Sequence, residues 1–333
     1  MLFVSLGCPA GVGPEVSVAA ALRMPARVVL VGSRIVVAAA ASSLGVGHER
    51  LVAFDGRAPK RGQIAVCDPG PTLSARDYRP GRPSKLAGRA ALSWIDAAVR
   101  LTREHPKSAM VTGPVSKASI ANSGARGAAG FRGHTEHIEK LLGSPHSVMC
   151  FYTPGFSTSL VTTHLPVKKA TRAITPERVC IATVELAEFL RALGIKHPKI
   201  AVASLNPHAG EAELLGREES TAIIPGLRLA RRRLRGGAEL SGPIGAETAY
   251  RVAHGGGYHG VVGMLHDQAT IPTKLVAFGD AVNVTLGLPI IRTSVDHGTA
   301  YDIAWQRKAD PEGMLAAMQL AHRLLPFSRV SGR

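Results

Sequence analysis

Short apolar runs of strand length alternate with segments of helical periodicity along most of this chain. The expected strands are Leu2–Leu6, Val28–Val31, Ala109–Thr112, Ser147–Tyr152, Leu160–Thr163, Ile200–Ser204, Val261–Leu265 and Ala281–Leu286. The expected helices are Pro14–Arg23, Leu86–Arg103, Pro176–Leu193, Glu218–Leu234 and Pro311–Leu324. Such alternation is typical of parallel strands joined by helices, so it predicts an α/β fold with helices on both sheet faces.

The segment Arg57–Arg82 breaks the alternation, because it is rich in Pro, Gly and Arg. We expect it to be an irregular excursion on the surface. A length of 333 residues suits about two domains or one large α/β unit. No internal repeat or low-complexity linker marks a boundary between domains.

Composition narrows the class of protein. Hydrophobic residues make up 45% of the chain but aromatic residues only 5%, so small and aliphatic side chains must build the core. No apolar stretch reaches the roughly 18 residues that span a bilayer, and the N-terminus has no positively charged leader. The cysteines are scattered without a Cys-x-x-Cys pair, as expected for reduced thiols. We therefore expect a cytoplasmic protein with no membrane partner. The cysteines are Cys8, Cys67, Cys150 and Cys180.

The net charge is +16, from 40 basic and 24 acidic residues, which suits either nucleic acid or an anionic substrate. The densest basic run, Arg228–Arg235, has almost no aromatic residues nearby to stack on bases, which favours a solvated helix face. We expect no nucleic-acid partner. The alternative, a basic nucleic-acid binder, predicts retention on DNA with a steep salt dependence.

Three histidines follow apolar runs at widely separated points of the chain: His164, His208 and His266. In open α/β sheets, ligands bind beyond the carboxyl ends of the strands. Three neutral imidazoles brought together there could hold one divalent cation and leave a coordination position open for a substrate. Taken singly, each histidine could instead hydrogen-bond to a strand end, and the spacing is no local metal motif.

Three glycine-rich turns are further candidates for ligand-binding sites. Gly255–Gly260 matches Gly-x-Gly-x-x-Gly, but the strand follows it instead of preceding it, so we interpret it as a loop. Gly7–Gly13 lies between a strand and a helix, where it could cradle an anion or simply form a tight turn. Gly133 precedes a helix whose first turn holds His134 and Thr135, and exposed N–H groups there favour a phosphate or carboxylate. Alternatively, Thr135 is an N-cap.

The stretch with the most candidate binding residues follows His266. It combines basic and polar side chains with mainly apolar neighbours. Arg292 and Lys274 suit anion binding, although each taken singly could be a surface ion-pair partner. Together with Asn283 and the turn Asp296–Ala300, they predict a binding surface.

These segments resemble the 4-hydroxythreonine-4-phosphate dehydrogenase family of vitamin B6 biosynthesis. The matching motifs occur in family order and span nearly the whole chain. They are Pro9–Glu15, Thr112–Lys117, Gly133–Glu136, His164–Pro166, Leu205–Glu211, His266–Gln268 and Asn283–Ala300.

The resemblance implies a homodimer of two-lobed α/β/α subunits, related in fold to the isocitrate and isopropylmalate dehydrogenases. It implies active sites in the cleft between the lobes at the dimer interface, where histidines from both subunits bind one divalent cation. The expected lobes are residues 1–128 with 285–333, and residues 129–284.

The family's functional positions carry over to this chain by motif. The implied metal ligands are His164, His208 and His266. The implied substrate-binding residues are His134, Thr135, Lys274, Asn283 and Arg292. The implied nucleotide-binding loop is Asp296, His297, Gly298, Thr299 and Ala300, which would explain the missing dinucleotide fingerprint. Asp267 is a candidate for the group that removes the hydroxyl proton.

The implied reaction is oxidation of 4-(phosphooxy)-L-threonine with NAD or NADP, then decarboxylation to 3-amino-2-oxopropyl phosphate, in pyridoxal 5'-phosphate biosynthesis. A cation of Zn, Mg, Co or Mn would stabilise negative charge on the substrate oxygen, and the nicotinamide would accept the hydride. Related substrates are alternatives, namely phosphothreonate, phosphoerythronate or an aromatic cis-diol. A further alternative is a hydrolase or lyase that uses the histidines without a nucleotide, although the Asp296–Ala300 loop argues against it.

The chain departs from the family pattern at three places. Cys8 and Glu247 stand where the family usually has Asp, and Trp305–Lys308 stands where it usually has Gly-Thr-Gly-Lys. Trp305 and Arg307 therefore leave the cofactor preference open, and Arg307 could favour a 2′-phosphate.

Overall fold

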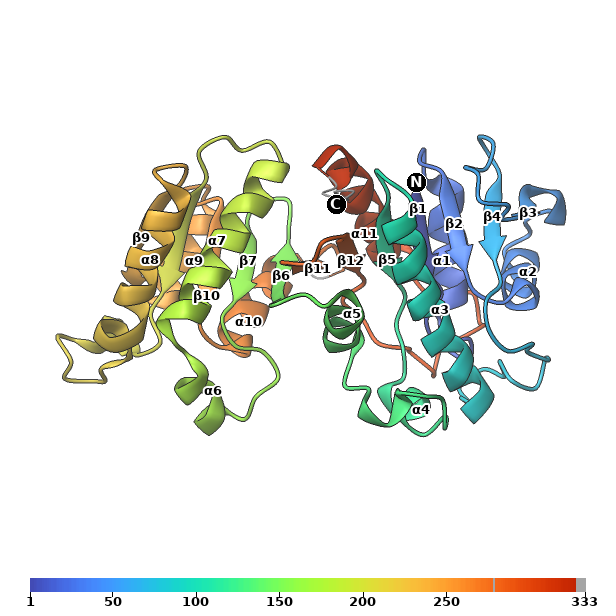
Figure 1. Ribbon diagram of the computed structural model, residues 1–333, viewed down its shortest axis with the longest axis horizontal. Coiled ribbons are helices and arrows are strands. Elements are labelled where there is room, and N and C mark those ends of the chain that lie inside the picture. Colours follow the sequence, from blue (N-terminus) through green and yellow to red (C-terminus); the bar gives the residue numbers. More distant parts are fainter. Residues whose placement is uncertain (278, 328–333) are drawn as a thin grey trace. The chain divides into compact units, whose positions relative to one another are not determined.

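The computed structural model describes residues 1–277 and 279–327. The chain divides into two compact units, Met1–His146 with Leu288–Arg333, and Ser147–Gly287 (Figure 1). Strands alternate with helices in both units, so the α/β fold is confirmed. None of the helices in the described residues is long and apolar enough to cross a membrane.

The first unit contains a parallel sheet. Its strand order is β3 (Leu51–Ala53), β4 (Ile64–Cys67), β2 (Val28–Val31), β1 (Leu2–Ser5), β5 (Ala109–Thr112) and β12 (Ile291–Ser294). Each neighbouring pair is parallel. The central strands are buried along their whole length, which explains their unbroken runs of apolar residues, since helices must cover both faces.

Helices cover both faces of this sheet (Figure 1). The helices α1 (Gly13–Arg23), α2 (Arg34–Ser43) and α11 (Glu312–Leu324) pack side by side on one face. The long helix α3 (Lys85–Glu104) covers the other face and contacts α4 (Lys117–Ala121) and α5 (His134–Leu142). Ser84 caps α3 by accepting a hydrogen bond from Ala87 N at 2.9 Å, and Trp94 on its buried face is fully enclosed.

The second unit has a mixed sheet. Its strand order is β11 (Val282–Leu286), β6 (Val148–Tyr152), β7 (Ser157–Leu160), β10 (Gly260–Gly263), β8 (Lys199–Ala203) and β9 (Glu239–Ile244). β6 is antiparallel to both of its neighbours, whereas β7, β10, β8 and β9 run parallel. The carboxyl ends of β7, β10 and β8 therefore lie next to one another.

The helices of the second unit enclose its core. α7 (Pro176–Ala192) packs against α8 (Ile224–Leu234), while α9 (Ala246–His254) and α10 (His266–Val276) contact β10. A short helix, α6 (Val167–Ala173), follows β7. The core between the sheet and α9 and α10 includes Phe151, Phe156, Leu160, Tyr250 and Val261.

Two expectations about elements were wrong. The strand expected at Leu160–Thr163 lies earlier, at Ser157–Leu160, because its polar side chains are satisfied inside the fold. Thr158 Oγ1 donates to Val261 O at 2.9 Å and Ser159 Oγ to Ala182 O at 3.0 Å. The segment Arg57–Arg82 is not wholly irregular, since it contains the buried strand β4.

The bounds of the units differ from the expected lobes at the first junction. The expected boundary at residue 128 precedes α5, but α5 belongs to the first unit, where it packs against α3. Residues 278 and 328–333 of the expected lobes lie outside the described residues.

Candidate active site

The three histidines follow neighbouring parallel strands of the second unit. His164 comes after β7, His266 after β10 and His208 after β8. None of them ends its strand directly, because the last strand residues are Leu160, Gly263 and Ala203. Each histidine instead lies in the loop or first helical turn beyond the strand end, where α/β sheets bind ligands.

Two of these histidines lie close together. The ring centroids of His164 and His266 are 5.5 Å apart. His266 begins α10, and its Nδ1 lies 2.7 Å from the Asp267 carboxylate oxygen Oδ1. A carboxylate on one ring nitrogen fixes the orientation of an imidazole and leaves Nε2 for a metal ion, so the donor chemistry fits a divalent cation.

His208 lies in a loop of unusual backbone conformation. Residues 208–213 all have positive φ, including His208 at 51° and Ala209 at 54°. The left-handed region costs non-glycine residues about 1–2 kcal/mol each. The buried carboxylate of Glu219 holds the start of this loop by accepting from Leu205 N at 2.9 Å and Asn206 N at 2.8 Å. Backbone strain held in place in this way is typical of functional sites.

Side chains tie the three strand ends together. Gln268 Nε2 donates to Ser204 O at 2.7 Å, and Gln268 Oε1 accepts from Met264 N at 2.7 Å, which joins the ends of β8 and β10. Thr162 Oγ1 donates to Met264 O at 2.6 Å, which joins β7 to β10. The loops that carry the histidines therefore begin from fixed positions.

The three predicted ligands are not brought together as one metal-binding group in the described part of the chain. Among the described residues, no group of three or more His, Cys, Asp or Glu side chains could hold a metal ion. His164 and His266 meet, but the joint role of His164, His208 and His266 stays a prediction.

Two predicted substrate-binding residues also belong to the second unit. Lys274 is exposed on α10, eight residues after His266. Asn283 lies in β11, where its Oδ1 is shielded from solvent and has no hydrogen-bond partner among the described residues. A shielded acceptor of this kind calls for a donor from a ligand.

The first unit holds a separate group of basic side chains at the start of α5, namely His134, Arg292 and Lys117, which we call the cationic pocket. His134 is the first residue of α5, and its Nε2 is shielded from solvent with no partner in the described part of the chain. Burial, and then the charges of Arg292, His137 and Lys117, lower the pKa of His134 well below its ordinary value. The imidazole is therefore neutral and can donate one hydrogen bond to an anion.

Arg292 supplies the buried cation of this pocket. It lies in β12 with 3% of its surface exposed, and its Nη2 donates to Thr112 Oγ1 at 2.7 Å. Burial lowers the pKa of Arg292 to about 10, against the opposing charge of Glu136. The guanidinium is thus still charged at neutral pH, and a buried cation favours an anionic ligand.

Lys117 joins this pocket and was missing from the predicted site residues. A Cβ atom added to Gly133 would lie 3.8 Å from Lys117 Nζ and 2.9 Å from the Glu136 carboxylate. The amine therefore lies over the start of α5. Lys117 belongs to the motif Thr112–Lys117, so the sequence contained a signal for it.

The alternative interpretation of Thr135 as an N-cap was wrong. Gly133 is the N-cap of α5, and no side chain makes a capping hydrogen bond there. Thr135 is half-buried in the first turn beside His134. The first N–H groups of α5 therefore stay available for an anion.

The expected nucleotide loop Asp296–Ala300 follows β12. It packs on the glycine-rich turn Gly7–Gly13 of the same unit, which we call the glycine turn. Val12 N donates to Thr299 O at 3.0 Å. A Cβ on Gly11 would lie 2.7 Å from Thr299 O, so only glycine allows this approach. Gly7 has φ 79°, which also requires glycine. His297 and Gly298 lie exposed at the tip, and Asp296 and Ala300 flank them half-buried.

The residues that depart from the family pattern are built into the same region. Trp305 has φ 61° and Arg307 φ 58°, which are conformations that suit the family's usual glycines. The buried carboxylate of Glu15 accepts hydrogen bonds from the backbone N of both residues, and Trp305 Nε1 donates to Pro9 O at 3.0 Å. These bonds offset the strain of the left-handed backbone.

Cys8 lies beneath this loop. Its Sγ is 3.3 Å from the Tyr301 hydroxyl, and burial raises the pKa of the thiol. Glu247 has a different setting, because it is exposed on α9 and pairs with Arg251 at 2.9 Å. Cys8 therefore stands at a buried position near the expected nucleotide loop, where the family usually has Asp. Glu247 also stands where the family usually has Asp, but its position is exposed to solvent.

An α/β chain with a cationic pocket in one unit and strand-end histidines in the other has the features of an α/β dehydrogenase. A family model described as pyridoxal phosphate biosynthetic protein PdxA matches residues 24–321, and the chain belongs to this family. The resemblance inferred from the motifs is thereby confirmed.

Named relatives match over nearly their whole length. The chain is 38% identical over 344 residues to a 4-hydroxythreonine-4-phosphate dehydrogenase of Bradyrhizobium diazoefficiens, which covers 97% of the chain and 96% of the relative. It is 37% identical to a D-threonate 4-phosphate dehydrogenase of Pectobacterium atrosepticum, over 97% and 99% of the two chains. A crystal structure of 4-hydroxythreonine-4-phosphate dehydrogenase from Klebsiella pneumoniae has a TM-score of 0.85 at 34% identity, over 98% and 99%.

Proposed function

We propose that this protein oxidises and decarboxylates 4-(phosphooxy)-L-threonine to 3-amino-2-oxopropyl phosphate, with a divalent cation and NAD or NADP, in pyridoxal 5'-phosphate biosynthesis. As a member of a dehydrogenase family, the chain uses a nicotinamide cofactor. The observation that carries the proposal is the cationic pocket at the start of α5, formed by His134, Lys117 and Arg292.

This pocket has the chemistry of a phosphate site. Arg292 presents a fixed guanidinium, Lys117 a mobile ammonium and His134 a neutral N–H donor. The free N–H groups at the start of α5 add the positive end of a helix dipole. Holding the phosphate in this pocket would fix the orientation of the rest of the substrate. Lys274 and Asn283 remain proposed substrate-binding residues of the second unit.

We assign the divalent cation to His164, His208 and His266, in a set completed across a homodimer. Neutral imidazole nitrogens suit Zn, Co or Mn better than Mg. When bound, the cation would supply positive charge beside the substrate hydroxyl oxygen, where negative charge develops. The contact between His266 Nδ1 and Asp267 supports this assignment.

Asp267 can serve the reaction in either of two ways. Its carboxylate is exposed and contacts His266 Nδ1, so it can orient that imidazole or accept the hydroxyl proton as hydride leaves the same carbon. We propose the orienting role, because the carboxylate already contacts a ring nitrogen of His266.

We propose that the nucleotide binds at Asp296–Ala300. The fixed packing of this loop on the glycine turn supports a preformed site. Arg307 is exposed beyond it and has a guanidinium that could contact a 2′-phosphate. A preference for NADP over NAD would follow from that contact.

A homodimer is the proposed assembly. Leu275 is 80% exposed, Ile271 58% and Val276 44% on α10, the helix that begins with His266. These side chains line a hollow of about 450 Å³ together with Phe156 and Tyr250. Exposed apolar surface of this kind marks protein interfaces, and a second copy would also complete the histidine set.

The proposed location is the cytoplasm, and the four cysteines support it. Cys8, Cys67, Cys150 and Cys180 are all free thiols. Reduced thiols are usual in the cytoplasm, whereas exported proteins tend to pair them.

The second candidate function is the oxidation of D-threonate 4-phosphate, favoured by the relative that carries this name. The phosphate pocket would serve both substrates, and the group on the carbon next to the carboxylate would distinguish them. The test is a turnover screen with NAD and NADP against 4-(phosphooxy)-L-threonine, phosphothreonate, phosphoerythronate and an aromatic cis-diol. Each reaction is run with Zn, Mg, Co or Mn and after chelation. Undiminished activity in chelated buffer would rule out the metal.

The pocket itself has a direct test. Lys117→Gln should lower kcat/KM for 4-(phosphooxy)-L-threonine about tenfold or more, since a charge-assisted hydrogen bond contributes about 1.5–3 kcal/mol. The rate with unphosphorylated 4-hydroxy-L-threonine should stay unchanged. Lys140→Gln, an exposed lysine at the other end of α5, is the matched control. Equal losses with both substrates would contradict a phosphate contact.

A further inference from the structure

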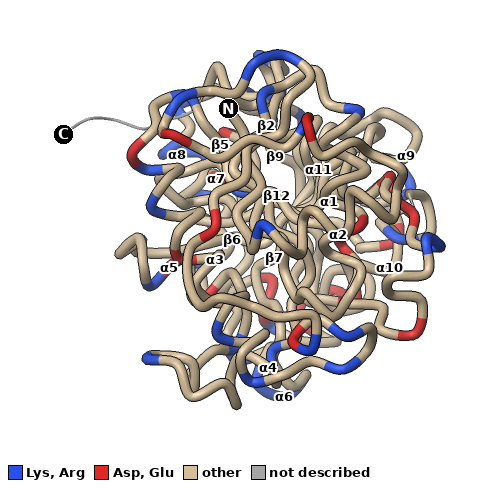
Figure 2. The backbone as a smooth tube through the Cα atoms, turned by 90° about the vertical axis from the view of Figure 1, so that its right-hand side faces the viewer, with Lys and Arg blue, Asp and Glu red and all other residues tan. Residues whose placement is uncertain are grey.

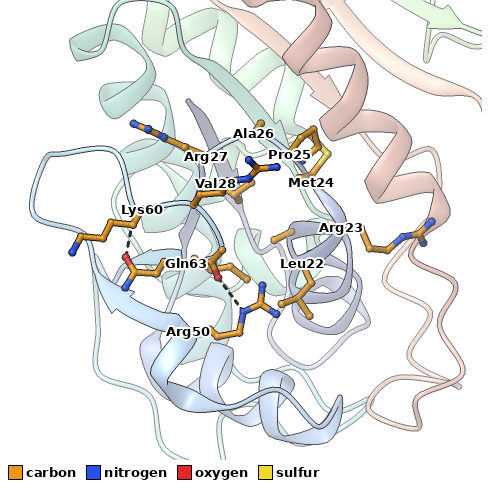
Figure 3. Close-up of a pocket in the computed structure, with 14 residues that line it drawn as sticks. Leu22, Arg23, Met24, Pro25, Ala26, Arg27, Val28, Arg50, Lys60 and Gln63 are labelled. Atoms are coloured by element: carbon orange, nitrogen blue, oxygen red, sulfur yellow. Dashed lines mark hydrogen bonds between the residues drawn. The ribbon is translucent and has the colours of Figure 1, made fainter.

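A second basic cavity lies in the first unit, away from the residues of the candidate active site (Figure 3). It has a volume of about 470 Å³. Its walls are the segment from the end of α1 to the start of β2, residues 21–28, then Arg50, and the turn 60–64 before β4. We call this cavity the basic hollow.

The basic hollow lies at the opposite end of the parallel strands. It is lined by the first residues of β2 and β4, Val28 and Ile64. In the same unit, Lys117 of the cationic pocket follows the carboxyl end of β5, and the loop Asp296–Ala300 follows that of β12. The 11 residues of α1 lead from the glycine turn to the hollow, which is about 16 Å at the rise of an α-helix.

The lining is strongly basic. It contains Arg23, Arg27, Arg50, Lys60 and Arg61, and no Asp or Glu. Arg23 forms an ion pair with Glu312, so its charge is balanced. For the other four cations, no carboxylate lies within 4.0 Å in the described residues. Lys and Arg outnumber Asp and Glu along the whole chain, 40 to 24, and Figure 2 shows them spread over many segments. The lining of the basic hollow differs from the chain as a whole in that it contains no acidic residue at all.

Local contacts fix part of this wall. Arg50 Nε donates to Gly62 O at 3.0 Å, and Lys60 N donates to Gln63 Oε1 at 3.3 Å (Figure 3). The first bond holds the turn before β4 against the start of β3, and the second lies within the turn itself. The side chains of Lys60 and Arg61 extend from this turn and are exposed, so both can rotate toward a ligand.

Electrostatics favour an anion in the basic hollow. Four cations without counter-ions repel one another, and low-dielectric walls concentrate their field. The positive field of Arg27 also reaches the amine of Met1, whose pKa is lowered first by burial and then by that charge. The carboxyl end of α1 opposes anion binding, but this effect is limited to the last turn of the helix, whereas the four unpaired cations surround the basic hollow.

The volume of the basic hollow and the residues that line it narrow the class of ligand that it can bind. A volume of about 470 Å³ lies within the range of small-molecule pockets, roughly 300–1,000 Å³. No aromatic side chain lines the cavity, so it offers no platform for stacking a base. We propose that the basic hollow binds a small, multiply charged anion of the oligophosphate or phosphate-ester class.

The experiment is calorimetric titration of the full chain with inorganic pyrophosphate. It is done in a Lys117→Gln, His134→Gln background to weaken the cationic pocket. The variant Arg27→Gln, Lys60→Gln, Arg61→Gln removes three cations whose side chains make no hydrogen bond or ion pair in the described structure. The control Arg228→Gln, Arg232→Gln, Arg233→Gln removes the same charge from exposed positions of α8.

We expect pyrophosphate affinity to fall at least tenfold in the hollow variant and to stay unchanged in the control. A charge-conserving variant, Arg27→Lys with Arg61→Lys, should keep most of the affinity and shows that the fold is intact. Equal weakening in both neutralised variants, or no binding in the background protein, would overturn the proposal. Duplex DNA that binds through the same three residues while pyrophosphate does not would also overturn it, in favour of nucleic acid.

Discussion

His134 is a residue whose protonation departs strongly from that of a free side chain. Burial and nearby cations keep its pKa well below the unfolded value of about 6.5. Between these two pKa values the unfolded chain binds a proton that the folded chain does not. Its contribution to stability is therefore fully present above about pH 6.5 and is lost as pH falls toward the folded pKa.

The corresponding prediction concerns stability against pH. On acidification below pH 6.5, wild-type protein should lose up to about 1.4 kcal/mol per pH unit through His134 alone. His134→Gln should lose less, because the replacement does not titrate. Thermal unfolding between pH 5.5 and 7.5 measures the difference. His197→Gln, an exposed histidine, is the control and should behave like wild type; identical pH profiles for all three proteins would contradict the prediction.

Arg307 is one of the residues that depart from the family pattern, and its substitution tests whether the backbone there is strained. Its φ of 58° is left-handed, and its backbone N donates to Glu15. Glycine removes the steric cost of this conformation, whereas alanine keeps it. Arg307→Gly should therefore be more stable than Arg307→Ala by about 1 kcal/mol, as measured by chemical denaturation. A more stable alanine variant would show that the left-handed backbone is not strained.

At the scale of elements, apolar periodicity predicts the buried parallel strands well. The runs at Val28–Val31 and Ala109–Thr112 are strands with those bounds. It fails at β7 because Thr158 and Ser159 are polar but bonded inside the fold. It also misses β4, a short strand next to charged and glycine-rich turns. Such cases depend on tertiary partners that a local pattern does not contain.

The candidate site, like the strands, could be predicted from the sequence only in part. The strand-end position of the histidines could be predicted, because parallel strands present their carboxyl ends together. The left-handed loop at His208 could not, since Glu219 holds it from a later segment of the chain. Lys117 lay within a matched motif, but its place over Gly133 depends on how α4 and α5 pack on α3.

Glu219 allows a prediction about that loop. Its carboxylate accepts from two backbone N–H groups and from Asn206 Nδ2 at 2.9 Å. Glu219→Gln replaces one acceptor by a donor, and should destabilise the fold by about 2–3 kcal/mol. It should also raise the metal concentration needed for half-maximal activity, because His208 loses its fixed position. Denaturation and metal titration measure both effects. Glu213→Gln, at an exposed carboxylate of the same loop, should change neither by much; a Glu219 variant with normal metal dependence would separate the loop from the metal.

At the scale of the molecule, the predicted site residues divide between the two units. The first unit has the cationic pocket and the loop Asp296–Ala300, and the second has the histidines and the apolar face of α10. One chain pairs His164 with His266 but assembles no three-residue metal set in its described part. Assembly of two copies would solve both deficiencies, since it would bury the apolar face and supply the missing ligand.

Leu275 provides the decisive test of this assembly. It is 80% exposed on α10, so an aspartate there costs little in an isolated chain but places a buried charge in a dimer. Leu275→Asp should convert a dimer into monomers in sedimentation experiments and should abolish metal-dependent turnover. Ile35→Asp, at an apolar side chain of α2 that is 42% exposed, should leave both unchanged. A wild-type protein that is monomeric and fully active would mean that one chain completes the metal site by itself. A Leu275→Asp dimer would mean that α10 lies outside the interface.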